Sequence, residues 1–244
     1  MIHQSYVLPA CSASEFLAFD ETMLELGETT GSEWLWFWES AVPWVVVGLG
    51  QSVAREVNEV ACANAGVPIF RRCSGGGTVV QGPGCLNYAL VLQIKRTAEL
   101  ASITGTNRWI MAQQRAALAS LASVPVEVQG YTDLALRTSV GLRKFSGNAQ
   151  RRRRDCLLFH GTILLDFDLR LIDALLLHPT TEPEYRAARR HDEFIANIGF
   201  RRQDVIATLE NVWSATRWSG ELPWRRVREL AASRYDRKEW NYRR

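Results

Sequence analysis

The chain has 244 residues, of which 47% are hydrophobic and 23% charged, a composition that is typical of globular proteins and excludes disordered and fibrous classes. Its 29 basic and 26 acidic side chains leave a formal net charge of only +3, which is too small to indicate a nucleic-acid partner. The longest apolar stretch, residues 42–49, is far too short to span a bilayer, so we expect no membrane partner either.

The five cysteines form no C-x-x-C pair, which favours a reducing compartment over a disulfide framework. Residues 1–10 lack the charged and apolar regions of a secretory signal. We therefore expect a cytoplasmic protein. The four histidines show no metal-ligand spacing, so we predict no protein metal site.

Hydrophobic periodicity and turn residues predict the elements in chain order. The first half begins with a helix at 14–26 capped by Ser12 or Ser14, a turn at 27–31, adjacent strands at 34–38 and 43–47, a helix at 52–66 and a strand at 69–72. After a glycine run follow a hairpin of strands 78–81 and 86–94, a helix at about 107–122, strands at 126–128, 134–136 and 156–167, and helices from 169 almost to the end. Because helices and strands do not alternate regularly, this order predicts an α+β fold. No repeat or linker divides the sequence, so we expect a single domain over 1–244.

The glycine run Gly75–Gly77 lies between two predicted strands. Three consecutive glycines cost backbone entropy, so this segment requires either positive φ angles or the close approach of another group. Bare N–H groups there can hold an anion, and Arg71 and Arg72 would pair with a carboxylate or phosphate. The spacing is not that of a dinucleotide-binding or P-loop motif, and a plain glycine-rich hairpin is the alternative interpretation.

A second polar segment contains Lys144 next to a Ser146–Gly147 turn. A lysine ammonium can stabilise a phosphate or a polarised acyl carbonyl without a metal or a nucleophile. Taken alone, a lysine in a loop is more often simply solvated.

Five motifs, in this order, carry a resemblance to a known family. They are R-R-x-S-G-G-G-T-V at 71–79, G-C-L-N-Y at 84–88, D-L at 133–134, K-x-S-G-x-A-Q at 144–150 and H-G-T-I-L at 160–164. Together they resemble the lipoate-protein ligase A and octanoyl transferase family, which is similar in fold to biotin protein ligase. The resemblance covers roughly residues 10–200 and also touches Glu239–Tyr242.

The resemblance implies mixed, largely antiparallel sheets flanked by helices, with an acyl chain in a tunnel and an acyl-adenylate across it. It implies a ligase that joins lipoate, or a related medium-chain acyl group, to a lysine of a carrier domain, with Lys144 as the catalytic residue contacting the carbonyl and α-phosphate. ATP with Mg²⁺ would be the co-substrate, the Mg²⁺ being held mostly by phosphate oxygens and water. The implied substrate-binding residues are Arg72, Ser74, Gly75, Gly76, Gly77, Gln81, Asn87, Asp133, Ser146, Gly147, Ala149, His160, Gly161 and Thr162.

The sequence departs from the family pattern in ways that leave alternatives open. Gln81 stands where many members have a histidine, and a glutamine can hydrogen-bond a phosphate but cannot be a cation. The places where transferases carry a nucleophilic cysteine, 129–132 and 177–180, hold none, which favours ligase chemistry. A carrier-to-protein octanoyl or lipoyl transferase using Cys85 or Cys73 is the alternative, as is a non-catalytic acyl-carrier-binding subunit. We expect no C-terminal accessory domain. Three alternatives then stay open: a separate accessory subunit supports adenylation, the chain acts only in the transfer half-reaction, or adenylation proceeds without an accessory domain.

Seven basic residues fall within eighteen positions, namely Arg137, Arg143, Lys144 and Arg151–Arg154. No aromatic stacking pattern or recognition helix accompanies them, which argues against nucleic acid. The preferred interpretation is a docking surface for an acidic lipoyl carrier domain, with a solvated charged loop as the alternative.

Overall fold

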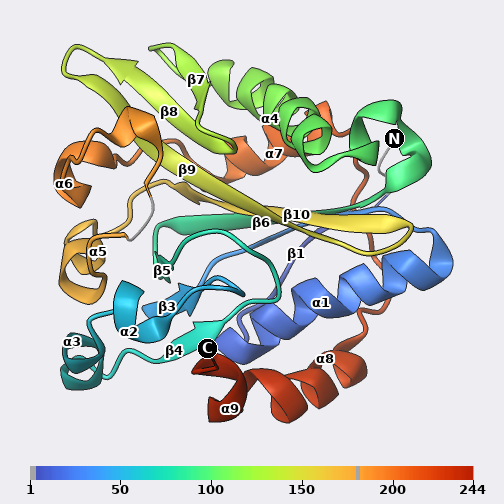
Figure 1. The fold of residues 1–244 in the computed structure, drawn as a ribbon. Coiled ribbons are helices and arrows are strands. Elements are labelled where there is room, and N and C mark those ends of the chain that lie inside the picture. Colours follow the sequence, from blue (N-terminus) through green and yellow to red (C-terminus); the bar gives the residue numbers. More distant parts are fainter. Residues whose placement is uncertain (1–3, 180–181, 244) are drawn as a thin grey trace.

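The computed structural model describes residues 4–179 and 182–243, which form two sheets with helices on their faces (Figure 1). The large sheet has the strand order β1-β2-β6-β10-β9-β8-β7 and the small one β4-β3-β5. Neighbours pair antiparallel, except for the parallel pairs β1–β2 and β3–β4. The predicted α+β fold with mixed, largely antiparallel sheets is therefore confirmed.

The strands are β1 (Ser5–Val7), β2 (Trp34–Trp38), β3 (Trp44–Val47), β4 (Ile69–Arg71), β5 (Val79–Gln81), β6 (Cys85–Gln93), β7 (Val126–Gln129), β8 (Asp133–Thr138), β9 (Gly141–Arg152) and β10 (Cys156–Leu164). The α-helices are α1 (Ala13–Thr30), α2 (Val53–Glu56), α3 (Glu59–Asn64), α4 (Ile103–Ala119), α5 (Arg170–Leu175), α6 (His191–Phe194), α7 (Arg202–Val212), α8 (Trp224–Leu230) and α9 (Lys238–Asn241). Short 3₁₀ turns occupy Ile94–Arg96, Ala98–Ala101 and Glu184–Arg186, and a π-helical turn occupies Ala231–Tyr235.

Helix α1 begins at a capping box in which Ser12 accepts from the Glu15 amide and Glu15 accepts from the Ser12 amide. The predicted turn at 27–31 is wrong, because the helix continues to Thr30 and ends at Gly31, whose φ of 73° is left-handed. Gly27 is instead a helix residue in close contact with the sheet: a Cβ there would lie 2.4 Å from Cγ1 of Val91 on β6. Its missing side chain lets α1 lie directly on the sheet, as Figure 1 shows.

Two predicted strand pairings are also wrong. β2 and β3 were expected to be adjacent, and β5 and β6 to form a hairpin, but in each case one strand belongs to the large sheet and the other to the small one. The chain changes sheet at Gly82–Gly84, where Gly84 has a φ of 82° and its α-carbon packs so closely on Asp166 that a Cβ would lie 2.2 Å from the Asp166 carbonyl oxygen. These two crossings place the small sheet opposite one face of the large sheet.

Other boundaries differ from the predictions. The single helix expected at 52–66 is two short helices, α2 and α3, separated by extended Val57. The helix expected at about 107–122 is α4, which begins earlier at an Ser102 cap and ends at Ala119. The helical region expected from 169 onwards consists of short helices joined by irregular segments, and the segment of Lys144 is a strand rather than a loop.

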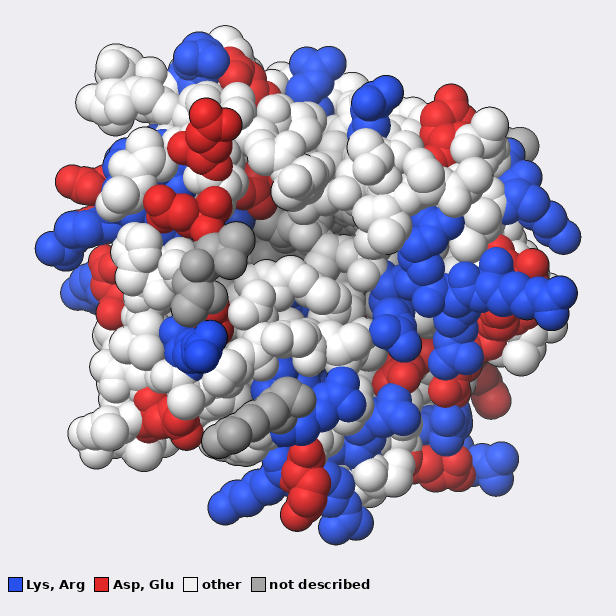
Figure 2. All heavy atoms as spheres, in the orientation of Figure 1, with Lys and Arg blue, Asp and Glu red and all other residues white. Residues whose placement is uncertain are grey.

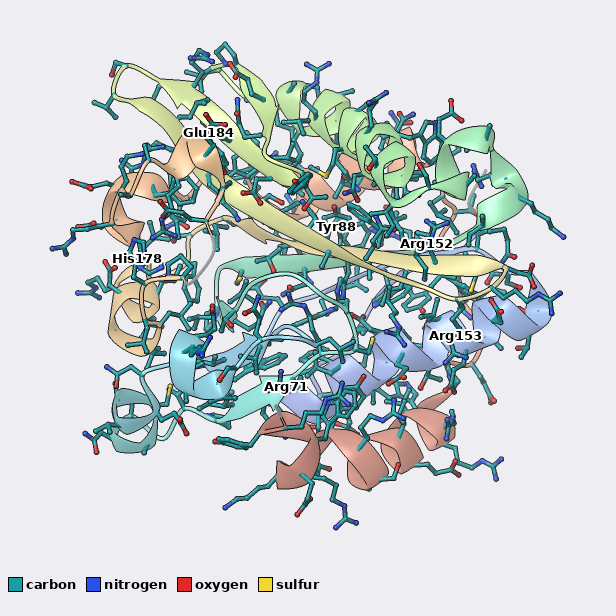
Figure 3. The ribbon with its side chains drawn as sticks, viewed as in Figure 1. Arg71, Tyr88, Arg152, Arg153, His178 and Glu184 are labelled. Carbon is teal, nitrogen blue, oxygen red and sulfur yellow. The ribbon has the colours of Figure 1, made fainter. Side chains whose placement is uncertain are left out.

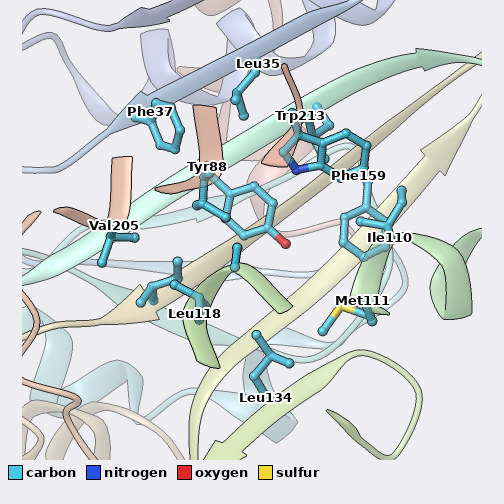
Figure 4. Packing of buried hydrophobic residues seen from close by; sticks show 14 of the residues in the cluster. Leu35, Phe37, Tyr88, Ile110, Met111, Leu118, Leu134, Phe159, Val205 and Trp213 are labelled. Atoms are coloured by element: carbon cyan, nitrogen blue, oxygen red, sulfur yellow. The ribbon is translucent and has the colours of Figure 1, made fainter. Parts of the chain in front are cut away.

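The large sheet is covered on both faces. One face packs on α4 and α7 through a core that includes Tyr88, Phe159, Ile110 and Val205 (Figure 4). The other face packs on α1 and α8, and a third cluster joins the small sheet to α2, α3 and α5. Among the described residues, no helix is long and apolar enough to cross a membrane.

Candidate active site

A cavity of about 840 Å³ lies where the large sheet faces the small sheet, α1 and the segment around residues 176–195. Most of the residues predicted from the sequence line it. They are Arg72, Gly76, Gly77, Gln81, Asn87, Asp133, Lys144, Ser146, Gly147, Ala149, His160, Gly161 and Thr162. Ser74 and Gly75 are not part of the lining, and Ser74 is fully buried behind the loop.

Strand register explains why residues so distant in sequence meet here. β10 pairs with β6 on one side and with β9 on the other, so Thr162 lies between Asn87 and Gly147, and His160 lies opposite Ala149. Residues directly opposite each other in a sheet share a face. The side chains of Asn87, His160 and Thr162 therefore lie on one face of the sheet, towards the cavity.

Lys144 is held by a short chain of polar contacts. Its Nζ lies 2.8 Å from Asp133 Oδ1, and the Tyr185 hydroxyl donates to Asp133 Oδ2 at 2.9 Å. The backbone of Lys144 is fixed as well, because its carbonyl accepts from the Ala196 amide at 2.9 Å. Both Asp133 oxygens are thus in use. Tyr185 was absent from the predicted site because a lone tyrosine in an irregular segment gives no sequence signal.

Burial and the neighbouring Asp133 carboxylate both raise the pKa of Tyr185. A phenol with a raised pKa keeps its proton at neutral and mildly alkaline pH. Tyr185 therefore acts as a constant hydrogen-bond donor to Asp133.

Three side chains near the centre of the cavity are bonded to one another. Gln81 Nε2 donates to Asn87 Oδ1 at 2.9 Å and to Thr162 Oγ1 at 3.1 Å, and Asn87 Nδ2 donates to Gln81 Oε1 at 2.8 Å. Gln81 and Asn87 are each only 4% exposed. Gln81 thus ties the small sheet to the large one across the cavity.

The guanidinium groups of the two arginines before the glycine run, Arg71 and Arg72, donate to backbone carbonyl oxygens of the protein itself. Arg71, which Figure 3 shows beside the C-terminal helix, is 0% exposed, and its guanidinium donates to carbonyl oxygens of Gly48, Gln51 and Asn241. Arg72 donates to the carbonyls of Gly75 at 2.6 Å and Gly77 at 2.7 Å. Burial lowers the pKa of Arg72 to about 10, which still leaves it charged at neutral pH. The backbone thus supplies acceptors for both buried charges, and for Arg72 these acceptors belong to the glycine loop itself.

The cysteines named as alternative nucleophiles lie away from the cavity lining. Cys73 is 5% and Cys85 0% exposed. Burial raises the pKa of Cys73 to about 12 and raises that of Cys85 as well. At neutral pH both are protonated thiols, whereas the nucleophile is the thiolate. Of the two segments without cysteine, 129–132 borders the cavity, and in 177–180 Thr180 lies outside the described residues.

No cluster of three or more metal-ligating side chains occurs in the part of the chain that the structure describes. His191 instead contacts Asp173, its Nδ1 lying 3.0 Å from Oδ1. Burial, followed by the nearby Arg186 charge, lowers the pKa of His191.

Fold and cavity together define an α+β protein in which two sheets enclose a binding site with a paired lysine. Residues 12–206 match the family model of the lipoyl protein ligase A/B catalytic domain. The chain belongs to this family, which confirms the resemblance in the sequence motifs.

Curated relatives match over part of their length. Lipoate-protein ligase LplJ of Bacillus subtilis is 24% identical over 215 residues, which are 82% of this chain and 62% of that protein. A probable lipoate-protein ligase A of Mycoplasma pneumoniae is 32% identical over 135 residues, 55% of this chain and 37% of that protein. The matched region thus spans about three fifths or less of these two relatives.

Solved structures match over nearly the whole chain. A bipartite lipoate protein ligase from Thermoplasma acidophilum, described with its E2 lipoyl domain, has a TM-score of 0.82 at 22% identity, covering 99% of this chain and 96% of that one. A lipoate-protein ligase A bound with ATP has a TM-score of 0.80 at 21% identity, covering 99% of both chains. At these identities the likeness shows the fold.

Proposed function

We propose that residues 1–244 form one catalytic domain that joins lipoate, or a related medium-chain acyl group, to a specific lysine of a carrier domain. The carboxylate attacks the α-phosphorus of ATP and displaces pyrophosphate, which gives an acyl-adenylate. The carrier lysine amine then attacks the acyl carbonyl, loses a proton and displaces AMP. Relatives named as lipoate-protein ligases and neighbours with bound lipoic acid or ATP support this assignment.

The observation that carries the proposal is the position of Lys144. Its side chain lines the cavity and is 28% exposed, its Nζ has Asp133 as a counter-charge at 2.8 Å, and its backbone is fixed within a strand. Both half-reactions build negative charge on phosphate and carbonyl oxygens, and a fixed ammonium stabilises that charge without reorganisation. We assign Lys144 the catalytic role and the cavity-lining polar residues the binding of substrate.

Mg²⁺ would enter with the ATP phosphates, since Mg²⁺ in such sites keeps several waters and is held largely by phosphate oxygens. Because the proposed reaction uses ATP, we place the protein in the cytoplasm. The proposed acceptor is a lipoyl carrier domain, as in the Thermoplasma system.

The test is to incubate the protein with lipoate, labelled ATP and an apo carrier domain, and to follow acyl-AMP and carrier modification. Lys144→Ala is expected to remove about 3 kcal/mol of transition-state stabilisation, which lowers the rate on the order of a hundredfold. Lys95→Ala, at an exposed lysine outside the cavity, is the matched control.

Unchanged carrier modification by Lys144→Ala would contradict the mechanism. No turnover with any acyl donor would favour a non-catalytic carrier-binding subunit. Formation of acyl-AMP by the purified chain alone would mean that no separate accessory subunit is required for adenylation.

A further inference from the structure

Asp20 of α1 is a buried carboxylate that belongs to none of the sequence motifs. It is 2% exposed and lines the cavity together with His160. Its Oδ1 accepts from Trp36 Nε1 at 3.1 Å, and its Oδ2 lies 2.6 Å from His160 Nδ1. Burying a carboxylate costs free energy unless hydrogen bonds compensate it, so we ask what these two contacts of Asp20 hold in place.

The contact continues from His160 into the glycine loop. His160 Nε2 lies 2.6 Å from Ser74 Oγ, and Ser74 Oγ in turn accepts from Arg72 Nε at 3.0 Å. Arg72 Nη2 ends the chain on the carbonyls of Gly75 and Gly77. Asp20 of helix α1 is thereby linked, through His160 of β10, to the side chains that hold the glycine loop.

Asp20, His160 and Ser74 have the order of a Ser-His-Asp triad, but Ser74 is not placed to act as a nucleophile. Its side chain is 0% exposed, lies outside the cavity lining, and uses its oxygen to accept from Arg72. A nucleophilic serine must reach an acyl carbonyl. The chain of contacts therefore acts on the loop and not on a substrate carbon.

Peptide geometry fixes the direction in which the amides of the glycine loop point. In a trans peptide, the C=O and the following N–H point in opposite directions. Because Arg72 draws the Gly75 and Gly77 carbonyls towards itself, the amides of Gly76 and Thr78 point away from Arg72. Within the described residues neither amide donates to a protein acceptor, although both residues line the cavity.

We propose that Asp20 is a positioning residue that acts through His160 and Ser74. It keeps Arg72 against the loop carbonyls, so that the amides of Gly76 and Thr78 stay available to an anionic oxygen of the ligand. The inference rests on the proposed function, in which that anion is the acyl carboxylate or an adenylate phosphate. Backbone N–H groups in such a turn bind either kind of oxygen.

The hydrogen-bond pattern explains why a carboxylate is required. Ser74 Oγ accepts from Arg72 Nε, and Asp20 Oδ2 faces His160 Nδ1. In the proposed arrangement Ser74 gives its own proton to His160 Nε2, so that the imidazole proton is on Nδ1, facing Asp20. Trp36 Nε1 is a donor as well, so both partners of Asp20 require acceptors. In Asp20→Asn the amide has a single acceptor oxygen, and one donor is left facing an NH₂ group.

The matched pair of variants is Asp20→Asn and Asp173→Asn. Asp173 makes the same kind of contact with His191, on α5 and α6, away from the glycine loop. ¹⁵N NMR of the His160 ring, assigned with His160→Gln, is expected to place the proton on Nδ1 in the wild type and to shift in Asp20→Asn only. Hydrogen exchange of the peptide over 72–78 is expected to be about tenfold faster in Asp20→Asn.

Titration calorimetry with lipoate and with ATP, run separately, identifies which oxygen the amides bind. Asp20→Asn should weaken one of the two by about tenfold, the effect of one misaligned hydrogen bond to a charged group. Ser74→Ala, which keeps the Asp20–His160 contact but breaks the link to Arg72, should reproduce the faster exchange and weaker binding. This second variant decides the question if Asp20→Asn fails to fold.

Wild-type exchange and affinities in both Asp20→Asn and Ser74→Ala would overturn the inference, as would labelling of Ser74 by a fluorophosphonate. If the wild type does not ligate lipoate at all, the proposed function fails. The ¹⁵N NMR of the His160 ring and the hydrogen exchange of residues 72–78 still test the role of Asp20, because neither measurement depends on ligation.

Discussion

At the scale of single residues, Tyr185 contributes to the orientation of Lys144 through Asp133, to which both side chains bond. Tyr185→Phe removes the donor to Asp133 Oδ2 and leaves the Lys144–Asp133 pair less constrained. A hydrogen bond to a charged group contributes about 1.5–3 kcal/mol, so we expect kcat to fall by roughly tenfold or more, with a smaller change in the KM for ATP.

Tyr131→Phe, at a tyrosine that is 87% exposed at the rim of the cavity, is the control for loss of a phenol. Because the pKa of Tyr185 is raised, the wild-type activity should not decline through this group as the pH rises to 10. Equal kcat values for Tyr185→Phe and the wild type in steady-state kinetics would show that Asp133 is positioned by other contacts.

The buried thiols allow the transferase alternative to be tested. With its pKa raised to about 12, Cys73 has almost no thiolate at neutral pH, and Cys85 is buried with a raised pKa too. We expect the Cys73→Ala/Cys85→Ala protein to keep its turnover within about twofold. The measurement is carrier modification together with a search for hydroxylamine-labile acyl-enzyme, and a labile adduct that disappears in the variant would support thioester exchange.

At the scale of elements, the contact between α1 and the sheet sets a boundary of the site, because Asp20 and Leu17 of this helix line the cavity. Gly27→Ala would gain up to about 1 kcal/mol of helix propensity. However, its Cβ would lie 2.4 Å from the β-branched Val91, and overpacking of this kind costs about 1–3 kcal/mol. We predict a net loss of stability in urea unfolding, while Gly50→Ala, where nothing lies within 4 Å, should be close to neutral. Equal midpoints for the two variants would contradict this.

The sequence predicts local features of these elements better than their pairing. The Ser12 cap and the positions of most strands follow from short-range patterns, and they are present in the structure. That β2 and β3, or β5 and β6, belong to different sheets depends on contacts between distant segments, such as Gly84 against Asp166. No periodicity within a strand contains that information.

The candidate site shows the same limit. Motifs with several unusual residues, such as the glycine run and the segment of Lys144, indicated residues of which nearly all line the cavity. Asp20 and Tyr185 were missed because each is a single polar residue within an ordinary helix or irregular segment. Their importance depends on partners 140 and 52 positions away in the chain.

At the scale of the whole molecule, three of the seven basic side chains predicted to cluster around Lys144 form ion pairs within the protein. Arg137 pairs with Glu127, Arg153 pairs with Glu25, and Lys144 pairs with Asp133. Arg143 and Arg152 have uncharged partners: the carbonyl oxygens of Ile195 and Asp192 for Arg143, and the Leu100 carbonyl and the Thr106 hydroxyl for Arg152. Of the seven cations, Arg151 and Arg154 are exposed without an ion pair among the described residues.

Arg151 belongs to the last part of β9, and Arg154 lies between β9 and β10. Figure 2 shows Lys and Arg side chains gathered over this end of the β9–β10 hairpin. Figure 3 labels Arg152 and Arg153 near this end of the hairpin, and Glu184, which also lines the cavity, on the opposite side of the view. On the cavity side of β9, Arg151 follows Ala149 by two positions, so both side chains are on one face of the strand. A carrier held at Arg151 would therefore lie close to Ala149 of the cavity lining.

We therefore expect an acidic carrier domain to be steered by Arg151 and Arg154 rather than by the whole basic run. Arg151→Glu/Arg154→Glu should raise the KM for the carrier by about tenfold at low salt, leave kcat and the KM for ATP nearly unchanged, and flatten the salt dependence. Arg225→Glu, a 95% exposed arginine on α8, is the matched charge reversal elsewhere on the surface. An equal rise in KM for both proteins would mean that the net charge of +3, and not this location, governs the encounter.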